Sequence, residues 1–133
     1  MASSQTDLAD PQTVLAAVSK AMVALHKEQF GRGPTRARSN FAGRDALVCV
    51  LEDALLPAEL AMVQMGDQQR VRESRLYLQV ATADAFIDAI QEIVHRKVRG
   101  FSSATDPDVN MVFEVFAFEP ETAWNDGAVR LPT

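Results

Sequence analysis

The sequence has little of several things that would point to a particular chemistry. It contains one cysteine, Cys49, and only two histidines among 133 residues. A single cysteine excludes a disulfide within the chain and makes a reducing cytoplasm the simplest compartment. The first residues lack the basic and apolar regions of a signal peptide. No apolar run approaches the roughly 18–20 residues that a membrane-spanning helix needs. We therefore expect a soluble cytoplasmic protein that reaches a membrane only through a partner.

Basic residues are also scarce. The formal net charge is −5 and the isoelectric point is about 4.9, which argues against nucleic-acid binding because that function needs a broad basic face. Hydrophobic residues make up 47% of the chain. This composition and length predict one globular domain that can bury a core without metal or disulfide support.

The exception to the acidic balance is the segment from Gly31 to Arg38, which has three arginines within seven residues. Glycine and proline there stop a preceding helix and leave backbone N–H groups without helical partners. Amides beside guanidinium groups suit an anion or an acidic partner. The structural alternative is a helix C-cap followed by an edge strand that carries arginines. The candidate binding residues are Arg32, Gly33, Thr35, Arg36 and Arg38.

Catalytic and metal-binding patterns are missing from the sequence. The glycines of the segment fit neither a P-loop nor a dinucleotide fingerprint. His26 and His95 fall in separate helices without ligand spacing, so we interpret both as surface or helix-end residues. Cys49 lies inside an apolar run and is interpreted as a core residue with a raised pKa. Three arginines between residues 70 and 75 are typical of a solvated helix face, and Asp106 and Asp108 of a solvated turn. We predict no cofactor, no metal and no catalytic residue. A polar cavity lined by titratable groups would revive an enzymatic hypothesis.

The order of apolar periodicities predicts an α+β domain. Helices are expected at residues 10–30, 58–65 and 67–97, the last with a break at residues 82–84. The first of them is expected to start at an aspartate cap, Asp10, with Pro11 at the first helical position. Strands are expected at residues 35–41, 46–51, 98–103 and 111–118, forming hairpins in a small, mainly antiparallel sheet with helices packed on one face. The domain is predicted to span residues 10–120, between a flexible N-terminus (1–9) and a flexible acidic tail (121–133).

The last predicted strand, residues 111–118, is apolar on both faces, with only Glu114 clearly polar. Such a strand is central in its sheet, or has one face covered by another chain. We therefore predict a homo-oligomer, a dimer in the simplest case.

Several segments together resemble the MpsC family, named for component C of a sodium-translocating membrane-potential-generating system. They are residues 21–28 running into the Gly-Arg-Gly-Pro block at 31–34, then residues 48–52, 55–59, 93–98 and 113–120. The resemblance covers roughly residues 12–120. It implies a small cytoplasmic accessory protein associated with membrane partners that carry out ion or bicarbonate transport, and it carries over no catalytic residue.

Two positions depart from the pattern of the family. Leu56 stands where such sequences tend to have threonine before the helix-opening proline, which weakens a helix cap. His95 follows Val94 where they tend to have Thr-Gly, which leaves the end of that helix open.

Two functional hypotheses follow, and they belong to different classes. The leading one is a non-enzymatic accessory or regulatory protein that acts through protein–protein contacts. The alternative is a sensor that binds a small anion or a nucleotide at the Gly31–Arg38 segment.

Overall fold

The computed structural model describes residues 10–121 and confirms the predicted order of elements. The predicted flexible segments lie outside these residues, except for Glu121. The elements are α2 (Pro11–Phe30), β1 (Arg36–Phe41), β2 (Ala46–Glu52), α3 (Pro57–Gln64), α4 (Gln68–Val94), β3 (Val98–Asp106) and β4 (Met111–Phe118).

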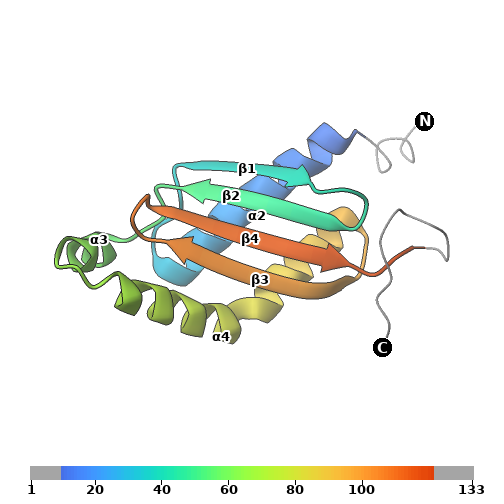
Figure 1. Ribbon diagram of the computed structural model, residues 1–133. Coiled ribbons are helices and arrows are strands. Elements are labelled where there is room, and N and C mark those ends of the chain that lie inside the picture. The colour runs from blue at the N-terminus through green and yellow to red at the C-terminus, as the bar shows by residue number, and fades with distance from the viewer. Residues whose placement is uncertain (1–9, 122–133) are drawn as a thin grey trace, which may run out of the picture.

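The four strands form one antiparallel sheet in the order β1-β2-β4-β3. Both predicted hairpins are present, and the pairing of β2 with β4 joins them. β4 is therefore a central strand, as its two apolar faces predicted. Helix α2 and the second half of α4 lie behind the sheet, while the opposite face carries no helix (Figure 1). We call the uncovered side the open face and the helix-covered side the inner face.

Strand β2 shows how the sequence sets the core. Leu47, Cys49 and Leu51 alternate along it and are fully buried on the inner face, because successive side chains of a strand point to opposite sides. Val18 and Met22 of α2 pack in the same core cluster as these residues. The residues between them, such as Val48 and Val50, lie on the open face.

The residues at the two ends of α2 explain where the helix begins and ends. The Asp10 side chain accepts a hydrogen bond from the Gln12 N–H and Pro11 fills the first turn, as the sequence predicted. At the other end Gly31 has a φ of 83°, and its N–H bonds to the Lys27 carbonyl. A left-handed residue at this position favours glycine because it has no Cβ.

Helix α4 differs from the prediction in two ways. It is one continuous helix through residues 82–84, because the Thr82 hydroxyl donates to the Leu78 carbonyl of its own helix instead of capping a new one. It also ends at Val94, three residues earlier than predicted. His95 adopts a left-handed conformation with a φ of 61° and closes the helix, a position that glycine would ordinarily occupy.

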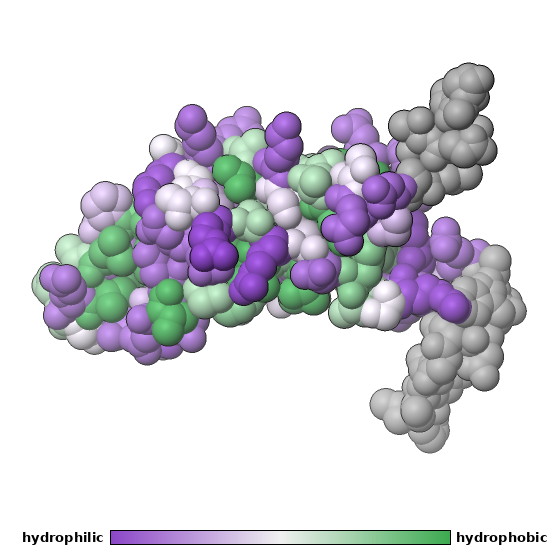
Figure 2. Space-filling model, turned by 90° about the horizontal axis from the view of Figure 1, so that it is seen from above, coloured by the Kyte–Doolittle hydropathy of each residue, from purple (hydrophilic) through white to green (hydrophobic). Residues whose placement is uncertain are grey.

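The remaining boundary differences are small. β3 runs to Asp106 instead of ending at residue 103, so the connecting turn is shorter than expected. Helix α3 starts at Pro57 and ends at Gln64. Seen from above, hydrophobic residues gather at the end of the molecule where α3 lies (Figure 2). Met65, directly after α3, is 82% exposed there.

Candidate functional site

The structure divides the Gly31–Arg38 segment between structural and exposed positions. Gly33 packs against α2 so closely that an added Cβ would lie 2.9 Å from the carbonyl oxygen of Val23. Pro34 is buried. The Thr35 N–H donates to the Glu52 carbonyl and extends the β1–β2 pairing by one residue. This half of the segment connects α2 to the sheet.

Arg32 is bound within the domain. Its Nη1 donates to the backbone carbonyls of Asp53 and Leu55, at 2.8 and 3.0 Å, and its Nη2 lies 2.9 Å from the Asp53 carboxylate. Hydrogen bonds from Arg32 and Thr35 lower the pKa of Asp53. The guanidinium of Arg32 thus fixes the turn after β2, whereas Arg36 and Arg38 lie on the sheet.

Arg36 and Arg38 project from the open face, because they alternate with Ala37 and Ser39 of the inner face. Both are exposed. Arg38 makes a long ion pair of 3.7 Å with Glu52 on the neighbouring strand. Of the five predicted binding residues, these two are therefore brought together as an exposed basic pair at the β1 edge.

The inner face contains a polar row that the sequence analysis did not identify. The register aligns Ser39, Cys49, Glu114 and Ser103 across all four strands, in that spatial order. Helix α2 contributes to the same layer, since the Ser19 hydroxyl lies 2.8 Å from that of Ser39. Burial raises the pKa of the Cys49 thiol to about 11, with a smaller opposing effect from the Ser39 hydrogen bond and a further increase from the Glu114 charge. The prediction of Cys49 as a core residue with a raised pKa is therefore confirmed.

A hydrogen-bonded histidine–carboxylate pair and an arginine–carboxylate ion pair are buried beside this row. His26 Nε2 lies 2.8 Å from Glu114 Oε2, and both side chains are 3% exposed. Arg75 of α4 holds Glu59 of α3 through Nε and Nη2, at 2.8 and 2.6 Å. The interpretation of His26 as a surface or helix-end residue is therefore wrong, and so is that of Arg75 as part of a solvated helix face.

Aromatic rings pack against both pairs. Phe30 stacks on the His26 ring, with centroids 5.5 Å apart, and the Arg75 guanidinium lies 4.0 Å from the centroid of the Phe30 ring. Phe86 meets His26 edge-on. These contacts shield the polar and charged groups from bulk solvent and strengthen their electrostatic interactions.

A small polar cavity separates the pairs, between α2, α4, β3 and β4. Its volume is about 10 Å³, and His26, Arg75 and Glu114 are among the residues that line it. Each of the three has a buried polar atom without a protein partner: Nδ1, Nη1 and Oε1 respectively. A space of this size holds about one water molecule. A water that accepts from Arg75 and donates to Glu114 would satisfy two of these atoms, whereas a metabolite would not fit.

A comparison with protein-family models gives a match over most of the chain. The family model described as Na+-translocating membrane potential-generating system (MpsC) matches residues 12–120, which is most of the chain. The chain belongs to the MpsC family. Neither the comparison with curated proteins nor that with solved structures found a match.

The structure explains the two positions at which this MpsC chain departs from the pattern of the family. Leu56 gives α3 no side-chain cap, and the Glu59 carboxylate accepts the Leu56 N–H at 2.8 Å instead. Glu59 thereby combines an N-terminal helix contact with the buried pair to Arg75. His95 replaces the tight turn through its left-handed backbone.

Within residues 10–121, none of the MpsC helices combines the length and the hydropathy that crossing a membrane requires. The same residues contain no group of three or more acidic, histidine or cysteine side chains arranged to hold a metal ion.

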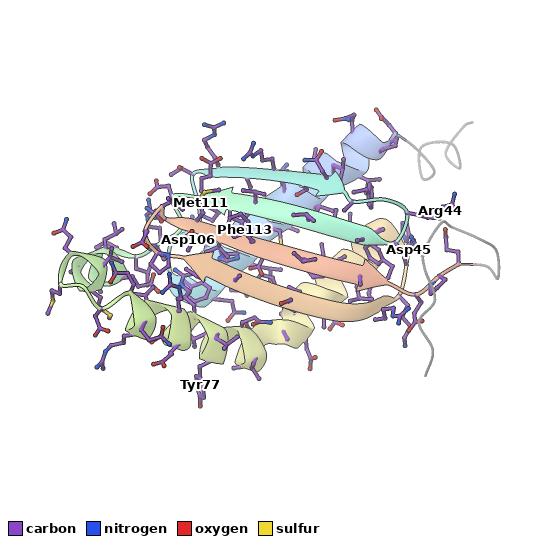
Figure 3. The ribbon with its side chains drawn as sticks, viewed as in Figure 1. Arg44, Asp45, Tyr77, Asp106, Met111 and Phe113 are labelled. Carbon is purple, nitrogen blue, oxygen red and sulfur yellow. The ribbon has the colours of Figure 1, made fainter. Side chains whose placement is uncertain are left out.

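An exposed apolar stripe lies on the solvent side of the MpsC helix α4. Tyr77 and Val80 are 77% and 71% exposed, and Leu76 is exposed beside them. Tyr77 points away from the sheet into solvent (Figure 3). Arg75 and Phe86 lie on the opposite, buried side of the helix. We call Leu76, Tyr77 and Val80 the α4 stripe.

Proposed function

We propose that this chain is a non-enzymatic accessory component of the sodium-translocating, membrane-potential-generating system for which its family is described. In this proposal the chain acts by binding a membrane protein partner through the α4 stripe. Family membership supports the system, and the stripe is the observation that supports a protein contact. The polar cavity does not favour an enzyme because it has room for about one water molecule.

The position of the stripe is unusual for a soluble helix. Leu76 and Val80 are one turn apart, and Tyr77 lies beside both, so the three form one surface. A solvent-facing stripe normally carries charged residues. Tyrosine is also enriched at the centres of protein interfaces, where it supplies a large contact area. The stripe therefore resembles an anchor for a partner more than a solvated surface.

The rim of the stripe indicates the charge of that partner. Glu73 lies one turn before Tyr77, Asp84 one turn after Val80 and Arg72 one turn before Leu76, and all three are exposed. An apolar stripe whose rim has two carboxylates and one guanidinium suits a surface with an apolar groove and a mainly basic rim. Cytoplasmic loops of membrane proteins carry an excess of lysine and arginine. A cytoplasmic loop region of an integral membrane protein therefore has the required chemistry.

Flotation with membrane vesicles tests this contact. Vesicles from cells that lack the chain would be mixed with purified protein and separated from unbound protein on a density gradient. Wild type is expected to float with the vesicles, whereas Val80→Glu stays unbound. Val109→Glu is the matched control, because Val109 is also an exposed valine, at 57%, but lies in the β3–β4 turn. Equal flotation of Val80→Glu and wild type would exclude the α4 stripe as the contact with the membrane partner.

The anion sensor is the second proposal, and the exposed pair Arg36 and Arg38 is the observation that favours it. Arg32 contributes less, since its guanidinium is bound to Asp53 and two carbonyls. Thermal denaturation with millimolar phosphate, bicarbonate or nucleotide separates the two proposals. A sensor predicts a higher melting temperature that is lost in Arg36→Gln/Arg38→Gln. A melting temperature that none of these anions changes would contradict the anion-sensor proposal.

A further inference from the structure

The open face of the sheet is apolar in its centre and charged at its edges. Its two central strands present mostly aliphatic and aromatic side chains: Ala46, Val48 and Val50 of β2, and Met111, Phe113, Val115 and Ala117 of β4. Figure 3 shows Met111 and Phe113 on the sheet away from α2. Val115 is 38% exposed at the centre of β4. No described helix covers these side chains.

In the row that contains Arg36, the two edges of the sheet carry charges of opposite sign. The register places Arg36, Glu52, Met111 and Asp106 in one row across the four strands, so all four lie on the open face. The β1 edge therefore carries Arg36 and, in the next row, Arg38. The β3 edge carries Asp106 in the same row as Arg36. The exposed Arg99 lies at the opposite end of β3 from Asp106.

We propose that a second copy of this chain covers the open face, in a two-fold dimer whose axis runs parallel to the strands between the two stacked sheets. Such a rotation keeps each row level and exchanges the edges. It places β1 over the β3 of the other copy and β2 over the β4. The apolar central strands then face each other, with Val48 opposite a second Val115 and Val50 opposite a second Phe113.

The edge charges select this axis over the alternative. With the axis parallel to the strands, Arg36 of each copy faces Asp106 of the other, and the dimer has two such contacts. With the axis perpendicular to the strands, β1 would lie over the second β1 in the reverse direction, so Arg36 would face the far end of that strand, which carries no acidic residue. Opposite charges that face each other fix the orientation of an interface. Sheets stacked about 10 Å apart leave room for an arginine to reach an aspartate across the gap.

The size of the face indicates a modest interface. Four strands about 4.8 Å apart and about seven residues long give roughly 450 Å² in projection for each copy. The total of about 900 Å² for the two copies is in the range of weak, transient contacts. The dimer is therefore expected to dissociate on dilution. This surface is separate from the α4 stripe, so the dimer does not depend on the proposed membrane partner.

Sedimentation equilibrium over a range of protein concentrations tests the dimer and its orientation through a charge exchange. Wild type is expected to dimerise reversibly. Arg36→Glu alone and Asp106→Arg alone should each raise the dimer dissociation constant about 10-fold or more, because each places like charges together. The double variant Arg36→Glu/Asp106→Arg should have a dimer dissociation constant close to that of wild type, because it restores the opposite charges. Arg72→Glu, which reverses an exposed charge on α4, is the control and should leave the dissociation constant unchanged.

Asp106 also accepts a hydrogen bond from the Asp108 N–H in the turn, so a substitution of Asp106 could weaken the dimer by disturbing the fold. A second variant that leaves this turn intact is therefore needed. Val115→Glu introduces charge in the centre of the face without touching that turn and should abolish the dimer. A wild type that is monomeric at every concentration would overturn the proposal. So would a dimer that Val115→Glu leaves intact, or single charge reversals that weaken a dimer which the double variant does not restore. Each of these results leaves the flotation test of the α4 stripe standing on its own.

Discussion

Arg75 Nη2 lies 2.6 Å from Glu59 Oε1, and this buried pair fastens the first half of α4 to α3. The same guanidinium donates to the Ala54 carbonyl and stacks over the Phe30 ring. One side chain thus joins the α3 start, the turn before it and the end of α2. The α4 stripe begins with the next residue, Leu76. The orientation of the proposed contact surface therefore depends on a charged group in the interior.

Replacing Arg75 tests this dependence. Arg75→Met keeps much of the apolar stem but leaves the Glu59 carboxylate buried without its cation. Breaking a buried pair in this way costs about 3–5 kcal/mol, which urea denaturation would measure as a lower free energy of unfolding. Arg72→Met, an exposed arginine on the same helix, is the control and should change it by less than about 0.5 kcal/mol. Equal effects of the two substitutions would contradict the role given to Arg75.

The pH dependence of stability should show the ionisation of Glu59. Burial opposes that ionisation, but the hydrogen bonds from Arg75 and Leu56 and the charge of Arg75 outweigh it, so the pKa of Glu59 is lowered from its usual 4.5. Because the folded pKa is lower than the unfolded one, the stabilisation is present above pH 4.5 and is lost as the pH falls through the folded value.

Glu59→Gln lacks this titration and serves as the reference. The difference in free energy of unfolding between wild type and Glu59→Gln should be constant near neutral pH and should narrow below about pH 4.5. Urea denaturation at a series of pH values would measure it. A difference that stays the same down to pH 3 would show that the carboxylate gains nothing from Arg75 on folding.

Much of the fold was predictable from local sequence signals. The Asp-Pro start and the glycine end of α2 and the continuous apolar run of residues 46–51 predict elements that the structure confirms. The two apolar faces of residues 111–118 placed β4 in the centre of the sheet. The end of α4 was harder to predict, because a left-handed histidine at residue 95 replaces the glycine that usually marks a helix end.

The buried charges were not predictable from spacing alone. Arg75 lies among other arginines and matches the pattern of a solvated helix face, and its partner Glu59 is 16 residues away on another helix. His26 and Glu114 are 88 residues apart. Only the sheet register and the packing of α2 bring them together. One signal was present: Glu114 is the single charged residue in an apolar strand, and a charge there requires a buried partner.

A double-mutant cycle on His26 and Glu114 would measure the interaction free energy between the two side chains of this buried pair. His26→Phe and Glu114→Leu should each lower the free energy of unfolding by about 3–5 kcal/mol, because each leaves a buried polar partner unsatisfied. The double variant should be less destabilised than the sum of the two, since it removes both polar groups together. Additive effects within about 0.5 kcal/mol would mean that the two residues do not interact.

Gly33 offers a test of the most specific part of the family resemblance. Gly33→Ala would place a methyl group 2.9 Å from the Val23 carbonyl oxygen, which belongs to the backbone of α2 and cannot move aside easily. We expect a loss of about 1–3 kcal/mol in stability, measured by thermal or urea denaturation. Gly100→Ala is the matched control, because its Cβ would make only an ordinary contact of 3.9 Å with Ala117. An unchanged stability of Gly33→Ala would refute the close packing of this block against α2.

The most direct test of the proposed accessory function is the membrane potential of cells that lack the chain, measured with a voltage-sensitive dye. Deletion should reduce the potential, and wild type should restore it. Val109→Glu should restore it as well, whereas Val80→Glu, expressed and folded to the same extent, should not. Full restoration by Val80→Glu, or a potential that deletion leaves unchanged, would contradict a role that depends on the α4 stripe.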